Sequence, residues 1–465
     1  MEELVTCIKY GAGNICLALS ASGNGVAVRE MEGAAHIKTG YILDDTTNAA
    51  EAPGSQGRED PTESILSAVE SLAGRLILGT PYATGIAELD ATTEKMWPSF
   101  MKSASLLLRK LILGVPVIIR FHNDADGSSG AVALSRAVRN LSERLGLKPN
   151  PIWIMHRSVM YTGRDLEWDM LVANNYGSIE KPLLFIIDFG TSENSNQGID
   201  AAAGHLDVIW LDHHPIEEGF KGKSLEHYIN PWQFGSGSNY TAGYLACAFS
   251  HVFSEVETKD MEGASLIGDC STFAPQAKSG EQEAALLDLL TSDPKVISKA
   301  DGNLTPSEID GILSDSSRKE ELCNYAKVKL EETLDKAFVQ AKHVRAGKHE
   351  IIVLDYGEIR SEDTRYPLPG RFASKLLTEA DKNGGKHYLA IVHYNQFISM
   401  RAAGEVSDAV NIPDIIYQMK ELYLSGIDSG GGHKNAASIK VSIYGDKKEI
   451  LRSVIEMARE RLQSS

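Results

Sequence analysis

The sequence has little cysteine and no long apolar run. Its five cysteines among 465 residues are scattered and form no Cys-x-x-Cys pair, which argues against a cysteine zinc site and against a disulfide framework. No apolar stretch reaches the roughly 20 residues that a membrane-spanning helix needs. The N-terminus is acidic and lacks the basic start of a signal peptide. These absences predict a cytoplasmic protein with no membrane partner.

Positive charge is also in short supply. The chain carries 46 Lys and Arg residues against 63 Asp and Glu residues, which gives a formal net charge of −17. Proteins that coat duplex nucleic acid draw their affinity from basic side chains that neutralise phosphates, so this balance argues against such a role. For a phosphate-containing substrate, we expect bound cations to supply much of the positive charge that it meets.

The pattern of apolar residues divides the chain into four segments. Residues 1–80 contain short β-prone runs and then a polar linker, which predicts a small β-rich unit, with an OB- or S1-like barrel as one interpretation. Residues 81–274 alternate continuous apolar strands with helical patterns, as is typical of a doubly wound α/β domain with a parallel sheet. Residues 275–347 are helical and charged and predict a connector or insert. Residues 348–465 return to a smaller α/β pattern.

Acidic and histidine residues occur in four short segments of the predicted α/β domain. Three of these segments directly follow the apolar runs VPVIIR, PLLFII and DVIWL. Such positions are the carboxyl ends of parallel strands, where open α/β sheets bind their ligands. The candidate site consists of His122, Asp124, Asp126, Asp188, Asp212, His213, His214 and Asp269.

These residue types favour a metal centre that acts on phosphate esters. Divalent cations such as Mg²⁺ and Mn²⁺ prefer carboxylate oxygens, and imidazole adds a preference for Mn²⁺ over Ca²⁺. Two cations about 3.5–4 Å apart can hold both the attacking and the leaving oxygen of a phosphoryl transfer. We expect an extended strand end to direct His122, Asp124 and Asp126 to one side, with Gly127 allowing a tight turn before the next helix.

At these segments the sequence resembles the DHH phosphoesterase family. The stretches HNDADGSSGA, IIDFG, LDHHP and LIGD are similar to its four motifs and follow in the same order. The stretch YINPW is similar to an Asn-Pro segment of RecJ-type members. The likeness favours the archaeal RecJ-like nucleases, some of which associate with the GINS replication complex or with a helicase. The N-terminal unit departs from many of these relatives.

The resemblance also extends to the C-terminal part, which is similar to the DHH-associated domain. FISMRAAG and the Gly-Gly-Gly-His stretch are like two of its motifs, although Lys434-Asn435 replaces the more common His-Pro. Consecutive glycines let backbone N–H groups approach an anion. The residues that this part would use to bind substrate are Arg371, Arg401, Gly430, Gly431, Gly432 and His433.

The resemblance implies a role for each residue of the candidate site. One cation would be held by His122, Asp124 and Asp188. The other would be held by four residues, with Asp188 bridging the pair: Asp126, Asp188, His213 and Asp269. As the remaining catalytic residues, Asp212 would orient its neighbours, and His214 would contact the scissile phosphate and assist the leaving group.

Three functions are compatible with this pattern. The leading prediction is a Mn²⁺-dependent exonuclease on single-stranded DNA, or also RNA, that serves DNA repair or replication and uses two divalent cations, with Mg²⁺ as a substitute. A second is a phosphodiesterase for short oligonucleotides or cyclic dinucleotides. A third is a replication scaffold with weak or no activity. GINS or a helicase would be the protein partner.

Overall fold

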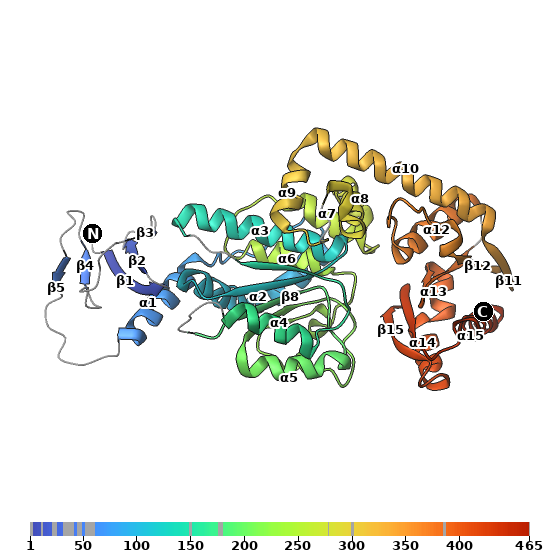
Figure 1. Cartoon of the computed structure of the whole chain (residues 1–465), viewed down its shortest axis with the longest axis horizontal. Helices are drawn as coiled ribbons and strands as arrows, with labels where there is room; N and C mark the ends of the chain where they lie inside the picture. The colour runs from blue at the N-terminus through green and yellow to red at the C-terminus, as the bar shows by residue number, and fades with distance from the viewer. Residues whose placement is uncertain are drawn as a thin grey trace. The chain divides into compact units, whose positions relative to one another are not determined.

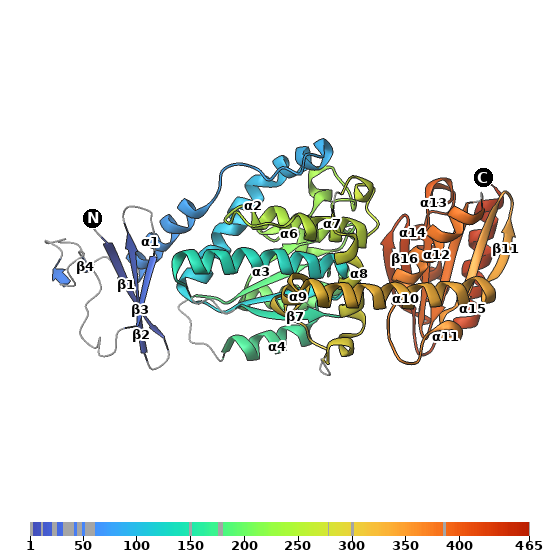
Figure 2. The same cartoon turned by 90° about the horizontal axis from the view of Figure 1, so that it is seen from above.

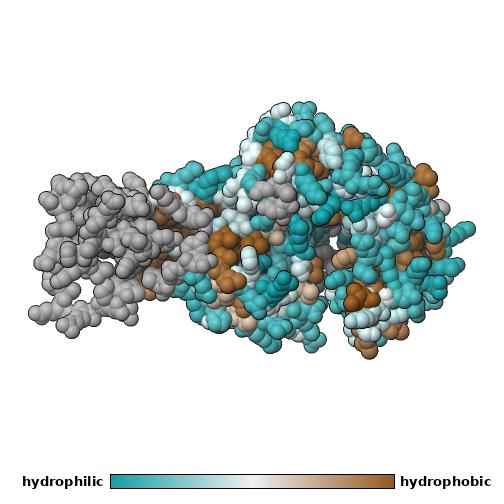
Figure 3. Space-filling model, viewed as in Figure 1, coloured by the Kyte–Doolittle hydropathy of each residue, from teal (hydrophilic) through white to brown (hydrophobic). Residues whose placement is uncertain are grey.

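The computed structural model forms two compact units, residues 1–280 with 305–310 and residues 281–304 with 311–465 (Figures 1 and 2). This division separates neither the N-terminal stretch nor the helical connector, so the four-segment division stays a prediction. No helix in the described part of the chain has both the length and the apolar character that a membrane crossing requires. On the face that Figure 3 shows, the apolar areas of the described residues are separated by hydrophilic surface. The residues that the structure describes are 61–147, 151–174, 180–277, 279–298, 302–384 and 387–464, with five strands in the first 60 residues.

The N-terminal stretch is β-rich, as predicted. Its five strands pair antiparallel in the order β3-β2-β1-β4-β5. A helix, α1 (Pro61–Leu76), follows them. The barrel interpretation stays a prediction. The strands are β1 (Glu3–Tyr10), β2 (Gly13–Ser20), β3 (Val26–Glu30), β4 (Tyr41–Leu43) and β5 (Ala49–Glu51).

The first unit is built on a parallel five-stranded sheet in the order β10-β9-β8-β6-β7. Its central strand β8 is buried along its whole length, because helices cover both faces. This confirms the doubly wound α/β prediction. The strands are β6 (Val117–His122), β7 (Ile152–His156), β8 (Leu183–Ile187), β9 (Asp207–Leu211) and β10 (Tyr228–Ile229).

Helices cover the two faces of this sheet unequally. The helices α3 and α6 lie on one face, and α4 and α5 lie on the other (Figure 1). The second face has its own core, in which Leu184 and Ile186 of β8 pack with Leu166 and Ile199 of the helices. The helices are α2 (Ala87–Leu113), α3 (Ala125–Leu145), α4 (Gly163–Asn174), α5 (Asn196–His205), α6 (Ala242–Ser250) and α7 (Lys259–Gly268).

Small residues let α3, α6 and α7 approach each other closely. A Cβ added at Gly243 would lie 2.8 Å from Ser265 Cβ, and one added at Gly268 would lie 2.6 Å from Ala125 Cβ. Real Cβ atoms do not approach other atoms this closely in packed interiors. The glycines therefore set the distance between these helices. As a result, the starts of α3 and α6 and the end of α7 meet at one edge of the sheet.

The second unit is a six-stranded mixed sheet in the order β11-β12-β13-β14-β16-β15. It confirms the predicted smaller α/β domain. The last residues of the predicted helical connector form a strand, β11, instead of a helix. These charged residues pair with β12 at the edge of the sheet. The strands are β11 (Lys342–Ala346), β12 (His349–Asp355), β13 (Tyr388–Tyr394), β14 (Phe397–Ala402), β15 (Ile427–His433) and β16 (Ala436–Val441).

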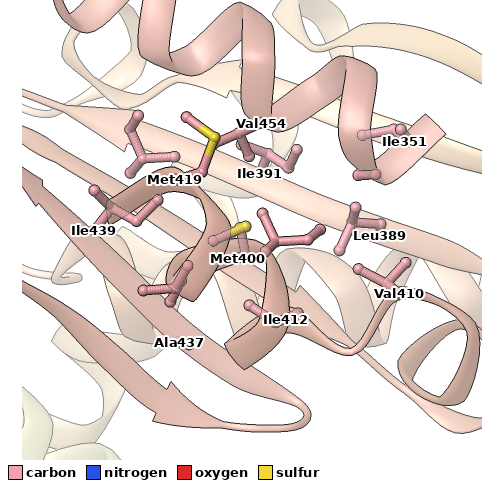
Figure 4. Close-up of a cluster of buried hydrophobic side chains, with 14 of the residues drawn as sticks. Ile351, Leu389, Ile391, Met400, Val410, Ile412, Met419, Ala437, Ile439 and Val454 are labelled. Atoms are coloured by element: carbon pink, nitrogen blue, oxygen red, sulfur yellow. The ribbon is translucent and has the colours of Figure 1, made fainter. Parts of the chain in front are cut away.

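Helices cover both faces of this second sheet as well. Alternate residues of β12 serve the two sides: Ile352 packs with Phe372 of α12, and Ile351 lies in the opposite core with Met419 and Val454 (Figure 4). The period of two in a strand explains this division. The helices from residue 281 onward, of which α9 spans the division between the two units, are α8 (Glu281–Ser292), α9 (Pro306–Ser314), α10 (Ser316–Gln340), α11 (Tyr356–Ile359), α12 (Pro369–Gly384), α13 (Gly404–Val410), α14 (Ile412–Leu422) and α15 (Lys447–Gln463).

Candidate metal centre

The candidate residues meet at the carboxyl edge of the parallel sheet. The strands β6, β8 and β9 are hydrogen-bonded neighbours, so the residues that follow them emerge side by side. Asp269 reaches the same edge from the end of α7. Three groups have ligand atoms within 4.8 Å of one another: His122, Asp124 and Asp188; Asp126, His213 and Asp269; and Asp188, Asp212, His213 and His214. Their roles as ligands stay predictions.

The first group joins the end of β6 to the start of α3. Asp124 is the N-cap of α3, and its Oδ1 accepts a hydrogen bond from Gly127 N at 3.0 Å. Its other oxygen, Oδ2, lies 2.8 Å from His122 Nδ1, and Asp188 Oδ2 lies 3.6 Å from the same nitrogen. The cap therefore fixes Asp124 beside the imidazole, and all three side chains face one point.

One detail of the predicted backbone was wrong. The alternation of an extended strand does not continue to Asp126, because α3 already begins at Ala125. Asp126 stands in the first turn of the helix. Helix geometry rather than strand alternation therefore directs its carboxylate toward the site. A carboxylate is favoured at this position because the N-terminal end of a helix carries partial positive charge.

Asp188 lies between the two groups in an unusual backbone conformation. Its φ is +70°, in the left-handed region that residues other than glycine rarely adopt. Such strain is concentrated at functional sites. Its Oδ1 lies 3.4 Å from His213 Nε2, whereas its buried Oδ2, on the His122 side, accepts no hydrogen bond from any described residue. A buried carboxylate oxygen without a donor is costly, and a cation would satisfy it.

Glycine is required at position 190, two residues after Asp188. Gly190 has a φ of +97°, and a Cβ there would lie 2.4 Å from Trp210 Cζ2. The Trp210 indole also donates a hydrogen bond to Phe189 O at 2.8 Å. The buried tryptophan thus holds the Asp-Phe-Gly segment, which explains why this motif has glycine at its third position.

His213 is surrounded by three carboxylates. Its Nε2 lies 3.5 Å from Asp126 Oδ2, 3.4 Å from Asp188 Oδ1 and 3.6 Å from Asp269 Oδ2. Ligands bonded to one cation at about 2.0–2.2 Å are about 3–3.6 Å apart, so this spacing fits a shared metal ion. Because Ser238 O can only accept, the 2.7 Å contact places a proton on His213 Nδ1. Nε2 then faces the carboxylates. Although burial lowers the pKa of His213, these carboxylates raise it well above its usual range, and a cation bound there would take the place of the Nε2 proton.

Asp126 is held by groups that lie far from it in the sequence and that belong to none of the predicted motifs. Its carboxylate accepts hydrogen bonds from Ala242 N at 2.9 Å, from Gly243 N at 2.8 Å and from Ser265 Oγ at 2.5 Å. Burial and the adjacent carboxylate of Asp188 raise the pKa of Asp126 well above its usual range. A cation would counteract this repulsion, so the residues fit a positively charged ligand.

Asp212 supports its neighbours instead of facing the centre of the site. Its Oδ1 accepts hydrogen bonds from His213 N at 2.7 Å and from His214 Nδ1 at 2.7 Å, and Thr191 Oγ1 donates to Oδ2. Although burial raises the pKa of Asp212, the neighbouring His214 lowers it well below the usual range. The carboxylate is therefore ionised and fixes the orientation of both histidines.

The substitution Asp212→Asn tests this supporting role. We expect it to weaken divalent-cation affinity and to lower turnover, each by about 10–100-fold, as is usual for groups that orient metal ligands. Isothermal titration with Mn²⁺ and a phosphodiesterase assay would measure the two effects. Unchanged affinity and turnover would contradict the role. Asp165→Asn, in the separate Arg120 network of the same unit, provides the control.

The remaining predicted residues lie in the second unit. Arg401 Nε donates to Ser374 Oγ at 3.0 Å, and Arg371 Nε lies 3.4 Å from Asp288 Oδ1. The Arg401 guanidinium lies against the start of α12, since a Cβ at Gly370 would lie 3.3 Å from Arg401 Nη2. The strand β15 contributes Gly430, Gly431, Gly432 and His433.

The glycine stretch lies next to Arg401 in the sheet. His433 and Arg401 both pair with Ala436 of β16, so their positions form one row across three strands. A Cβ at Gly431 would meet nothing within 4 Å, whereas Gly432 has a φ of +137° and a Cβ there would lie 2.4 Å from Ala436 O. Glycine is therefore required at position 432 by the backbone conformation and by the close contact. At position 431 there is open space where a side chain would lie. Substrate binding by this row stays a prediction.

Comparisons with known proteins match part of the first unit to a family. Residues 116–269 match the model of the DHH family, N-terminal domain. An uncharacterized protein of Methanocaldococcus jannaschii, MJ1198, is 25% identical over 426 residues, which cover 79% of this chain and 54% of that protein. The chain thus spans about half the length of this curated relative.

Solved structures show a similar fold. One, described as "Member of s1p family of ribosomal proteins PF0399 DHH domain", has a TM-score of 0.70 and 21% identity, and the match covers 86% of this chain and 98% of that one. RecJ from Thermus thermophilus in complex with Mn²⁺ has a TM-score of 0.49 and 17% identity, with 79% and 55% covered. The match to the DHH family model over residues 116–269 agrees with the motifs, and the fold of the chain is similar to that of the PF0399 DHH domain.

Proposed function

We propose that the protein is a Mn²⁺-dependent exonuclease that hydrolyses phosphodiester bonds of single-stranded DNA, or also RNA. The family match and the cluster of acidic and histidine residues support a DHH phosphoesterase. The observation that carries the finer proposal is the position of Asp188, whose two oxygens face two separate groups of ligands. A bridging carboxylate is what a pair of cations requires.

The side chains have distinct tasks in this proposal. His122, Asp124 and Asp188 would hold one cation, and Asp126, His213 and Asp269 would complete the other together with Asp188. When bound, the cations supply charge neutralisation and an activated water. His214 receives its orientation from Asp212 through Nδ1, so Nε2 is the atom that would donate a proton toward the phosphate or the leaving oxygen.

The acidic composition supports a small region of substrate contact. With a net charge of −17, the chain offers little of the general phosphate attraction that duplex binding needs. The cations of the first unit would bind the phosphate at the strand end. In the second unit, Arg371, Arg401 and Gly430–His433 would bind substrate. We also propose a cytoplasmic location, a task in DNA repair or replication, and GINS or a helicase as partner.

Digestion of end-labelled oligonucleotides tests this function. We expect Mn²⁺, and less effectively Mg²⁺, to support stepwise shortening of single-stranded DNA or RNA from one end, with little attack on blunt duplex. Preferential cleavage of dinucleotides or cyclic dinucleotides would instead support the short-substrate alternative. Intact substrates under every condition, together with unimpaired Mn²⁺ binding, would favour the scaffold. The Asp188→Asn variant serves as the inactive control.

A further inference from the structure

Trp232 is an exposed tryptophan close to the candidate metal centre. It belongs to the short turn Pro231–Phe234, which follows β10, and its side chain is 45% exposed. Two other tryptophans of the same unit, Trp97 and Trp210, are buried in the core. Trp168 of α4 is exposed as well, so exposure alone does not distinguish Trp232, whereas its attachment to the candidate site does.

Hydrogen bonds fix Trp232 to the Asp-His-His segment. Its Nε1 donates to His213 O at 3.2 Å and to Ser238 Oγ at 3.1 Å. The carbonyl of the same serine accepts the hydrogen bond from His213 Nδ1. Trp232 and the imidazole of His213 are thus held by one common residue.

The turn itself is attached at a second point. Asn230 caps it by accepting from Trp232 N at 3.0 Å, and Asn230 Nδ2 donates to His214 O at 3.0 Å. The turn is therefore bound to the carbonyls of both histidines. The polar edge of the indole is satisfied by the protein, and the remaining exposed surface of the ring is apolar. This arrangement positions an aromatic ring in advance, at little cost in conformational entropy.

We infer that Trp232 binds substrate by stacking on a nucleobase beside the scissile phosphate. This inference rests on the proposed function and names a specificity residue for it. In a nucleic acid the base is connected to the phosphate through a single sugar, so a ring attached to the His213–His214 segment lies where a base adjacent to the reacting phosphate can reach it. Stacking accepts any base, because every base has a π-face, and it predicts discrimination between nucleotides with and without a base.

Kinetics with two variants of the full chain test the inference. The substrates are single-stranded oligonucleotides, either complete or with an abasic nucleotide at the first or second position of the digested end. Stacking contributes about 1–3 kcal/mol per base, so Trp232→Ala should raise KM for the complete strand about 5–150-fold with little change in kcat. Trp232→Phe should recover most of this loss, because it keeps a stacking ring but not the indole N–H.

The abasic strand and the metal titration separate stacking from structural support. On at least one abasic strand, Trp232→Ala and wild type should have similar KM values, and Mn²⁺ affinity should be unchanged in both variants. The control is Trp168→Ala, which removes a tryptophan that is 58% exposed on α4 and should change nothing.

Each opposite outcome is decisive. If Trp232→Phe is as impaired as Trp232→Ala, and both lose Mn²⁺ affinity, the residue only braces His213. If Trp232→Ala cleaves complete strands like wild type, the stacking role alone is overturned and the nuclease proposal stands. If wild type cleaves no oligonucleotide, the proposed function is overturned and the inference with it.

Discussion

Replacing Asp188 by asparagine should reduce phosphodiester hydrolysis by at least about 10³-fold. Removal of one group that stabilises transition-state charge usually costs about 10²–10³ in turnover, and Asp188 would serve both cations at once. Asparagine keeps the size of the side chain but removes its charge. The buried Oδ2, which accepts no hydrogen bond from a described residue, is the atom whose loss matters most. Steady-state cleavage assays across a range of Mn²⁺ concentrations would measure the effect.

Thermal unfolding gives a second readout for Asp188 that does not depend on activity. A ligand at 100 times its Kd stabilises the folded state by about 2.7 kcal/mol, so Mn²⁺ should raise the Tm of wild type. The Tm of Asp188→Asn should rise much less. The Tm of each protein in chelator is the reference, so that the Mn²⁺-induced rise is compared apart from any effect of the substitution on the metal-free protein.

A surface substitution provides the control for both measurements. Asp200 is exposed and pairs with Lys221 on the outside of the first unit. Asp200→Asn removes the same charge from the chain but should change neither turnover nor the Mn²⁺-induced rise in Tm. An Asp188→Asn variant that kept the full Mn²⁺ effect on Tm would contradict the bridging role of Asp188.

The sequence was sufficient to predict the strand ends that carry the candidate residues. Continuous apolar runs before His122, Asp188 and Asp212 indicated buried parallel strands. The carboxyl ends of such strands lie at the same edge of the sheet, so these residues were expected to lie close together. The position of Asp126 was harder, because helix α3 begins one residue earlier. The stretch His122–Asp126 is compatible with an extended strand end and also with a helix that begins after a capping Asp124. The local sequence therefore did not show which of the two backbones carries Asp126.

Partners that are distant in the chain could not be predicted. Asp126 is held by amides of residues 242 and 243 and by Ser265, more than 110 positions away. Nothing in a serine or in a backbone amide marks it as such a partner. The contact of Trp232 could not be predicted either. The stretch YINPW was recognised in the sequence, but the hydrogen bond from Trp232 to His213 O depends on how the turn folds back. Arg401 was a plausible anion ligand by type, yet its bond to Ser374 depends on the packing of α12.

Gly127→Ala should damage both stability and activity, although it adds only one methyl group. The new Cβ would lie 2.5 Å from His122 O, 2.7 Å from His122 N and 2.9 Å from His122 Cβ. Two of these atoms are backbone, so a rotamer change cannot relieve the contact. Overpacking of this kind usually costs about 1–3 kcal/mol. We expect this loss in the free energy of unfolding, measured by urea denaturation.

The same displacement acts on the metal ligands, because the start of α3 carries them. Gly127 N donates to Asp124 Oδ1, and Asp126 precedes Gly127 directly. A shift of about 1 Å in reacting groups can lower turnover about 10²-fold, and we expect a loss of this size together with weaker Mn²⁺ binding. Gly204→Ala in α5 is the matched control, since a Cβ there meets nothing within 4 Å. It should stabilise the protein by about 0.4–1 kcal/mol and leave turnover unchanged. If both variants behaved alike, contact between α3 and the end of β6 would not position the ligands.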